Sequence, residues 1–229
     1  MKATYKFNIS LIFLAFSAIM SSCEKDNRPE PKSFLKGRIV YEGQTLGVRS
    51  NGVQLEIWQR GYQLFTKIPV FINQDGTFSA SLFDGNYKLV RLRGNGPWVN
   101  NTDTIDVELR GTKELDVPVR PYFVFKNDTY SKGEGKVSAT FTLQKVEATG
   151  VLERVNLYVG TTNILDPNNN GGNVQQLGTT ITDLTKPITL TATLSAALAG
   201  RDYVYARIGV KTSGVGEMLF GAPQKIQLK

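Results

Sequence analysis

The residues best suited to recognising a ligand lie in RGNGPWVNNTD, positions 93–103. Trp98 follows a glycine-rich turn, and Asn100, Asn101 and Asp103 come shortly after it. An indole ring stacks on the apolar face of a sugar, and amide and carboxylate groups suit its hydroxyls. The segment is therefore a candidate glycan-binding site. For Trp98 itself we favour the alternative, that the ring folds back and plugs the end of a β-sandwich.

A second candidate is Trp58 in VQLEIWQRGY, positions 53–62. If the apolar residues of VQLEI face the core, the alternation of side chains along a strand turns Trp58 outward. An outward Trp58 near Tyr62 would form a platform for a sugar ring. The alternative, that Trp58 covers a sandwich edge or contacts a second domain, is at least as well supported.

Composition excludes the commonest catalytic centres. The chain has no histidine and one cysteine, Cys23. Ser-His-Asp and Cys-His catalysis are therefore excluded, as are zinc sites built on imidazole or thiolate groups. We expect a non-catalytic protein with no cofactor and no metal site.

The acidic residues do not change that expectation. Asp103, Asp106 and Glu108 alternate along one predicted strand, whereas a glycosidase needs two carboxylates facing each other across the sugar, about 5–10 Å apart. We predict a solvated strand face. Asp166 in LDPNNNGGN offers one carboxylate among amides, too little charge for a calcium loop, and we predict a mobile loop there.

Alternation with a period of two dominates the chain and predicts an all-β protein. Gly-, Asn- and Asp-rich turns separate the apolar-alternating segments, which is typical of β-sandwiches. SAALAG (195–200) is the one weak helix candidate, and we interpret it as a short turn between strands. The main predicted strands are 53–57, 77–82, 104–109, 136–143 and 187–194.

Two domains are predicted, at 34–120 and 121–229, because two prolines interrupt DVPVRPYF (116–123). The first contains INQDGTFSASLFDGNYKLVRL and resembles carboxypeptidase-regulatory or transthyretin-like sandwiches. The resemblance implies turn glycines at Gly76 and Gly85. It also implies four residues between the sheets: Phe78, Leu82, Tyr87 and Leu89.

The second domain contains GRDYVYARIGVKTSGVGEMLF and resembles the last two strands of a fibronectin-III or immunoglobulin-like sandwich. The resemblance implies a corner role for Tyr203 or Tyr205. The expected architecture is thus two β-sandwiches in series.

The N-terminus predicts export. Lys2 and Lys6 precede the apolar run 9–20, which is too short to cross a bilayer and is typical of a signal peptide. MSSC resembles a bacterial lipobox. That resemblance implies removal of residues 1–22 and lipidation of Cys23, with 23–33 as an extended tether. The alternative is a free thiol after an ordinary cleavage site.

EKDN, directly after Cys23, resembles the surface-export signal of outer-membrane lipoproteins in Gram-negative gut anaerobes. It implies a lipid-anchored protein of the outer membrane that faces the cell exterior and contacts the membrane only through its anchor. The formal charge of +7 falls to +5 without the two lysines of 1–22, and basic residues form no run of five. We therefore expect no nucleic-acid partner.

Across most of its length the chain resembles an uncharacterised family of outer-membrane lipoproteins, defined by domains of unknown function and associated with starch-utilisation-type (Sus-type) glycan uptake. DGNYKLVRLRGNGPWVNNTDTIDVELRG and VRPYF carry the resemblance. It implies a non-catalytic accessory of glycan capture whose partners are a polysaccharide or oligosaccharide, an outer-membrane porin and a glycan-binding lipoprotein. The alternative is a structural spacer or assembly module that contacts those proteins without binding glycan.

Overall fold

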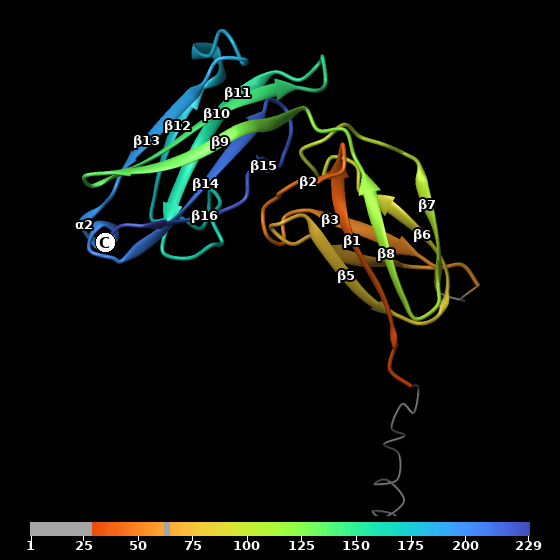
Figure 1. The fold of residues 1–229 in the computed structure, drawn as a ribbon. Coiled ribbons are helices and arrows are strands. Elements are labelled where there is room, and N and C mark those ends of the chain that lie inside the picture. The colour runs from red at the N-terminus through yellow and green to blue at the C-terminus, as the bar shows by residue number, and fades with distance from the viewer. Residues whose placement is uncertain (1–28, 62–64) are drawn as a thin grey trace, which may run out of the picture. The chain divides into compact units, whose positions relative to one another are not determined.

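The computed structural model describes residues 29–61 and 65–229. The predicted signal peptide, Cys23, most of the tether and Tyr62 lie outside these residues. Residues 32–229 form one compact unit, in which two β-sandwiches follow each other along the chain (Figure 1). In the part of the chain that the structure describes, no helix is long and apolar enough to cross a membrane.

The first sandwich packs two sheets around one core. In the first sheet the order is β2-β1-β5, and β8 also pairs with β1, in the parallel direction. In the second the order is β4-β3-β6-β7, all antiparallel. The strands are β1 (Ser33–Tyr41), β2 (Gln44–Thr45), β3 (Gln54–Trp58), β4 (Lys67–Phe71), β5 (Thr77–Leu82), β6 (Gly85–Arg91), β7 (Thr104–Leu109) and β8 (Thr112–Pro118).

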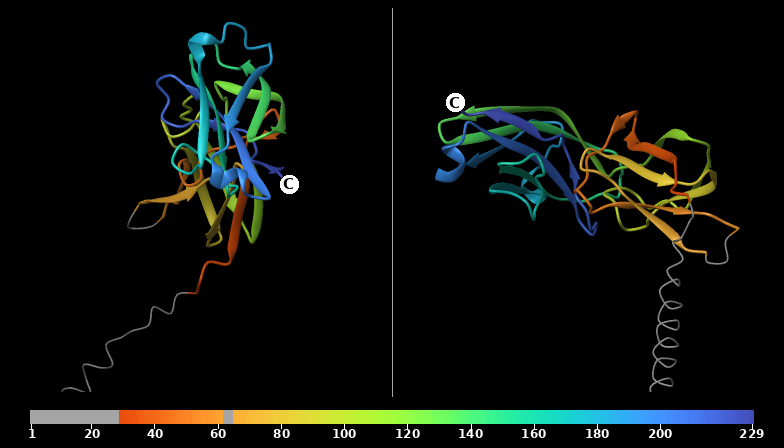
Figure 2. Two further views of the ribbon diagram at one scale, coloured as in Figure 1. Left: turned by 90° about the vertical axis from the view of Figure 1, so that its left-hand side faces the viewer. Right: turned by 90° about the horizontal axis from the view of Figure 1, so that it is seen from below.

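The second sandwich is antiparallel throughout. One sheet has the order β13-β10-β9, and the other β12-β11-β14, with β15 and β16 both pairing with β14. Figure 2 shows this sandwich, coloured green to blue, in two further views with the C-terminus marked. The elements are β9 (Phe123–Gly133), β10 (Lys136–Lys145), β11 (Leu152–Gly160), β12 (Gly172–Leu177), η1 (Gly178–Thr180), β13 (Ile188–Thr193), α2 (Ala196–Ala199), β14 (Tyr203–Thr212), β15 (Leu219–Phe220) and β16 (Gln224–Gln227).

The predicted all-β architecture of two sandwiches is confirmed. Each predicted strand overlaps an observed one, because alternating β-branched and aromatic residues place one apolar row on the inner face. The four side chains expected between the sheets of the first sandwich are buried, each at most 4% exposed: Phe78, Leu82, Tyr87 and Leu89.

Two local predictions need correction. Gly76 has a φ of +83°, as a turn glycine should, but Gly85 is absent from the positive-φ glycines. Gly85 instead begins β6, where an added Cβ would lie 2.5 Å from Nε2 of Gln59. SAALAG contains a single helical turn, α2, because buried Leu198 anchors it between β13 and β14.

Of the two tyrosines considered for a corner role, Tyr203 is 39% exposed and lies under the ammonium of Lys225, 3.8 Å from its ring centre. Tyr205 packs against a small buried cluster that includes Tyr158 and Phe220.

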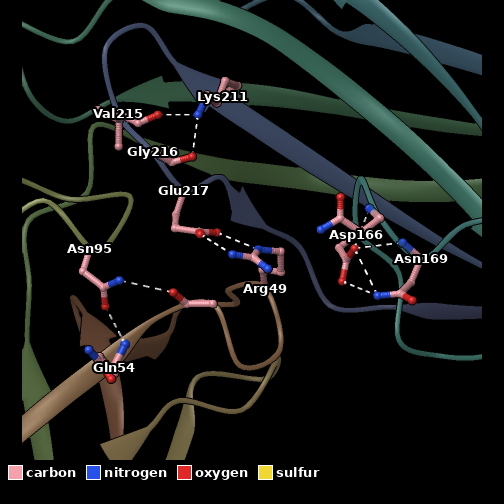
Figure 3. Close-up of polar contacts among 11 residues, drawn as sticks. Arg49, Gln54, Asn95, Asp166, Asn169, Lys211, Val215, Gly216 and Glu217 are labelled. Carbon is pink, nitrogen blue, oxygen red and sulfur yellow. Dashed lines mark hydrogen bonds and ion pairs between the residues drawn. The ribbon is translucent and has the colours of Figure 1, made fainter. Parts of the chain in front are cut away.

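The two sandwiches are joined through β15 and the loop after β2. The main-chain N–H of Phe220 donates to the oxygen of Gly47 at 3.0 Å, which extends strand pairing from one sandwich to the other. Arg49 and Glu217 form a two-point ion pair, with Nε–Oε2 at 3.0 Å and Nη2–Oε1 at 2.5 Å (Figure 3). Hydrogen bonds and charge together connect the two domains here.

Candidate functional site

The outer face of the β4-β3-β6-β7 sheet carries an aromatic cluster, in which Trp58 is half-buried and two phenylalanines are exposed. Trp58 points outward at the end of β3, as its position in the alternation predicts. Its ring centre lies 4.9 Å from that of Phe65, which is 54% exposed, at an angle of 40°. On the same face Phe71 is 50% exposed. We call Trp58, Phe65 and Phe71 the aromatic face.

Charged side chains surround Trp58. Its cross-strand neighbours are Lys67 on β4 and Lys88 on β6. Its indole N–H donates to Oε2 of Glu56 at 3.2 Å, and the ammonium of Lys67 donates to Oε1 of the same carboxylate at 2.7 Å. These bonds fix the indole in the outward position and leave Glu56 only 7% exposed.

The aromatic face has the chemistry of a sugar-binding surface. Aromatic rings offer flat apolar area to the axial C–H groups of a pyranose, and neighbouring lysines can donate to its hydroxyls. Asp106, which pairs with Lys88, places an acceptor on the same row. Sequence reasoning identified Trp58 but missed Phe65, because Phe65 lies in none of the predicted strands.

Trp98 does not join this surface. It is only 6% exposed and packs into the core of the first sandwich. Gly96 lies so close to the indole that an added Cβ would be 2.2 Å from its Cε2. A β-bridge also pairs Trp98 with Pro121. The ring therefore plugs the end of the sandwich, the alternative that the sequence favoured, and offers a sugar almost no surface.

The loop around Trp98 is held by its own amides. Asn95 accepts from the N–H of Gln54 at 2.6 Å and donates to the oxygen of Gly52 at 3.2 Å (Figure 3). Asn100 accepts from the N–H of Gly94 at 2.6 Å. Hydrogen bonds between these side chains and the backbone therefore hold the shape of the loop, as those of short polar residues between strands commonly do.

Asn100 and Asn101 line a pocket of about 310 Å³, which we call the arginine pocket. The residues that line it are Arg91, Val99, Asn100, Asn101, Pro118, Val119 and Arg120. Asp103 does not line the pocket, but its main-chain oxygen accepts from Nη2 of Arg91 at 3.3 Å. Of the predicted residues, Trp58 thus lies on the aromatic face, whereas Asn100 and Asn101 line this pocket.

Arg91 was missed by the sequence analysis. Tyr87, Leu89 and Arg91 alternate along β6 and share its inner face, so Arg91 is only 7% exposed. An arginine at an inward position of the alternation was the signal that could have identified it. Arginine side chains are almost never fully buried unless their charge is paired.

Asp166 corrects the predicted mobile loop. It is 2% exposed, and its Oδ1 accepts from the main-chain N–H groups of Asn168 and Asn169 at 2.7 and 2.9 Å. The side chain of Asn169 also donates to this carboxylate (Figure 3). The loop is an ordered turn. Among the described residues, no cluster of three or more His, Cys, Asp or Glu could hold a metal ion.

Asp106 and Glu108 lie on the solvated face of β7, as predicted. Both are exposed. Asp106 is paired with Lys88, and Glu108 lies 3.7 Å from Arg110.

Two family models match the chain. Residues 33–120 match "Protein of unknown function (DUF3823) N-terminal domain", and residues 123–225 match "Domain of unknown function (DUF3823_C)". No curated protein matches.

Solved structures match over almost the whole described chain. A DUF3823 family protein from Bacteroides ovatus is 38% identical, with a TM-score of 0.81, and the match covers 86% of this chain and 100% of that one. A DUF3823 family protein from Parabacteroides merdae is 34% identical, with a TM-score of 0.79, covering 88% and 100%. A Bacteroides uniformis protein described as a "putative carbohydrate binding protein" is 20% identical, with a TM-score of 0.72, covering 86% and 100%.

The B. uniformis protein, at this identity, shows the shared fold. The B. ovatus and P. merdae proteins share the fold and more than 30% of their residues over their full length. With both domain models matched in the same order, the chain belongs to the DUF3823 family.

Proposed function

We propose that this protein is a non-catalytic surface lipoprotein that binds glycan on its aromatic face, as an accessory of an outer-membrane polysaccharide uptake system. The observation that carries the proposal is the pair of Trp58 and Phe65, whose rings lie 4.9 Å apart on an exposed sheet face. Exposed apolar residues that lie together on a protein surface often mark a site that binds a ligand or a partner.

Further support comes from outside the aromatic face. The lipobox-like MSSC and the EKDN that follows it support an anchor at Cys23 and an outward-facing position. A structural neighbour bears the description of a carbohydrate-binding protein, although at 20% identity it lends support only to the fold that would carry such a site. The partners in this proposal are the other proteins of the uptake complex, a porin and a glycan-binding lipoprotein.

Affinity gel electrophoresis tests the proposal. The purified protein is run through gels that contain starch, xylan, pectic galactan or polygalacturonate. We expect retardation in at least one gel, and a loss of at least tenfold in affinity for Trp58→Ala and Phe65→Ala, because each removes one of the two rings that lie against each other.

Phe34→Ala is the matched control, since Phe34 is 40% exposed on the opposite sheet of the same sandwich. It should bind as wild type does. Retardation by no polysaccharide, or retardation that the Trp58 and Phe65 variants share unchanged, would contradict glycan binding at this face.

A second candidate function, a structural spacer, is favoured by the contacts between the sandwiches. The Arg49–Glu217 ion pair and the Phe220–Gly47 bond resist bending between the domains. A rigid spacer would hold a partner at a fixed distance from the membrane. Purification of the lipidated protein from membranes decides between the two: a stoichiometric porin or lipoprotein partner without glycan binding supports the spacer.

A further inference from the structure

The two sandwiches contain two buried arginines that differ in how fully they are bonded. Arg207 on β14 is 1% exposed, and its three nitrogens donate to the oxygens of Gly221, Leu165, Val48 and Gln74 at 2.7–3.5 Å. Its plane also lies over the ring of Phe220, 4.5 Å from the ring centre. The protein itself satisfies this guanidinium.

Arg91 is buried with less support. Nη1 donates to the oxygen of Pro118 at 2.7 Å and Nη2 to that of Asp103 at 3.3 Å. Its Nε is buried and has no hydrogen-bond partner in the part of the chain that the structure describes. Arg91 takes part in none of the ion pairs found among residues 29–61 and 65–229. A guanidinium is charged at every physiological pH, so this is a buried cation without a facing anion.

A cation in that position is costly to bury unless an anion compensates it. Arg91 nevertheless lines the arginine pocket. The volume of this pocket, about 310 Å³, is at the small end of the range for ligand sites. The pocket can admit a single sugar unit or charged group but not a stack of several rings.

The other polar side chains of the arginine pocket can also donate hydrogen bonds to a ligand. Oδ1 of Asn100 and Oδ1 of Asn101 each accept a main-chain N–H, from Gly94 and Asp103. The amide NH₂ group of each asparagine is therefore the part left for a ligand. Arg120 adds a second guanidinium, whose Nε is held 3.0 Å from Oε2 of Glu147. None of the described residues that line the pocket has a carboxylate side chain.

We propose that the arginine pocket binds the oxyanion of an acidic sugar, either the carboxylate of a uronic acid or a sulfate ester. Charge-assisted bonds from a guanidinium to such a group are among the strongest in proteins. The inference rests on the proposed function, because it gives the chemical class of the glycan, and it adds a second contact site to the aromatic face.

The two sites can be tested separately. Arg91 is the cross-strand partner of Leu55, whereas Trp58 lies three residues further along β3, roughly 10 Å away, and faces outward. A substitution in the arginine pocket should therefore leave stacking at Trp58 intact.

Isothermal titration calorimetry with three galactose-based probes tests the inference: trigalacturonate, galactose 6-sulfate and neutral galactotriose. We expect at least one acidic probe to bind tenfold or more tightly than galactotriose. The acidic probe that binds identifies carboxylate or sulfate as the preferred group.

Arg91→Gln should reduce binding of the acidic probe at least tenfold and leave galactotriose unaffected. Arg93→Gln is the control, since Arg93 is exposed two residues further on. If Arg91→Gln fails to fold, Asn101→Asp replaces it: the carboxylate can still accept from the N–H of Asp103 but presents a negative charge to the pocket. This variant should also lose the acidic probe.

Equal binding of acidic and neutral probes would overturn the inference and leave the proposed function standing. Acidic binding that survives both Arg91→Gln and Asn101→Asp would overturn it as well. Binding of no probe here, with no retardation by any polysaccharide, would contradict both proposals together.

Discussion

Arg207 of the second sandwich donates a hydrogen bond of 2.7 Å from Nη2 to the main-chain oxygen of Gln74 in the first. Because the guanidinium is removed from water, burial lowers the pKa of Arg207 to about 10, and nearby Asp166 partly opposes the shift. The side chain remains charged at neutral pH. Arg207 stabilises the fold because it donates hydrogen bonds to main-chain oxygens of both domains.

Arg207→Met should therefore destabilise the protein by more than about 3 kcal/mol, because several buried oxygens lose their donor at about 1–3 kcal/mol each. We expect the wild type to unfold in one cooperative transition and Arg207→Met in two, because the domains uncouple. Differential scanning calorimetry measures both effects. Arg93→Met, at an exposed position, should change the melting temperature little; one unchanged transition in Arg207→Met would contradict the assigned role.

The turn before β5 depends on Gly76. Its φ is +83°, and an added Cβ would lie 2.2 Å from the oxygen of Leu46. Gly43 has a similar φ of +76° but open space around it. Gly43→Ala should cost about 1 kcal/mol from the backbone alone, and Gly76→Ala more than about 2 kcal/mol, because strain and clash add. Urea denaturation of both variants measures the difference; equal losses would contradict it.

At high pH the second sandwich should lose stability through Tyr158. Burial raises the pKa of Tyr158 to about 12 from its ordinary value of 10. The folded protein therefore resists deprotonation, so the stabilisation is complete below pH 10 and is lost as the pH rises toward 12. Tyr158→Phe should show a shallower decline of unfolding free energy across this range. An identical decline in variant and wild type would contradict the prediction.

The proposed membrane anchor depends on Cys23. Cys23→Ala should abolish incorporation of a labelled fatty acid and move the protein from the membrane fraction to the soluble one, since the acyl chains supply the binding energy. Ser22→Ala is the matched control, because it keeps the thiol and a small residue before it. A Cys23→Ala protein that still sediments with membranes would contradict the lipid anchor.

Local alternation predicted the strands and much of the core, because each strand buries one face. It did not predict Arg207. In β14 both faces are covered, one by the core of the second sandwich and the other by Tyr158, Met218 and Phe220. Buried residues therefore follow one another along β14 without alternation. That second cover comes from residues distant in sequence and has no local signal.

The candidate site was predicted in part for the same reason. The position of Trp58 in the alternation placed it outward correctly, whereas Phe65 lies outside the strands, so its contact with Trp58 has no signal in the alternation. Asn100 and Asn101 were identified by composition alone. Arg91, the buried cation of their pocket, lies on β6, whose alternation predicts only core residues on its inner face. Its place in the pocket could be identified only from the tertiary structure.

Trp58 and Trp98 are the two tryptophans of the chain, so the fluorescence of a Trp98→Phe variant reports on Trp58 alone. Titration of this variant with oligosaccharides from the polysaccharide that retards the protein tests the central claim directly. The account predicts a saturable change in Trp58 emission, with reduced quenching by acrylamide and the same dissociation constant as calorimetry. Constant emission while calorimetry records binding would contradict a glycan site on the aromatic face.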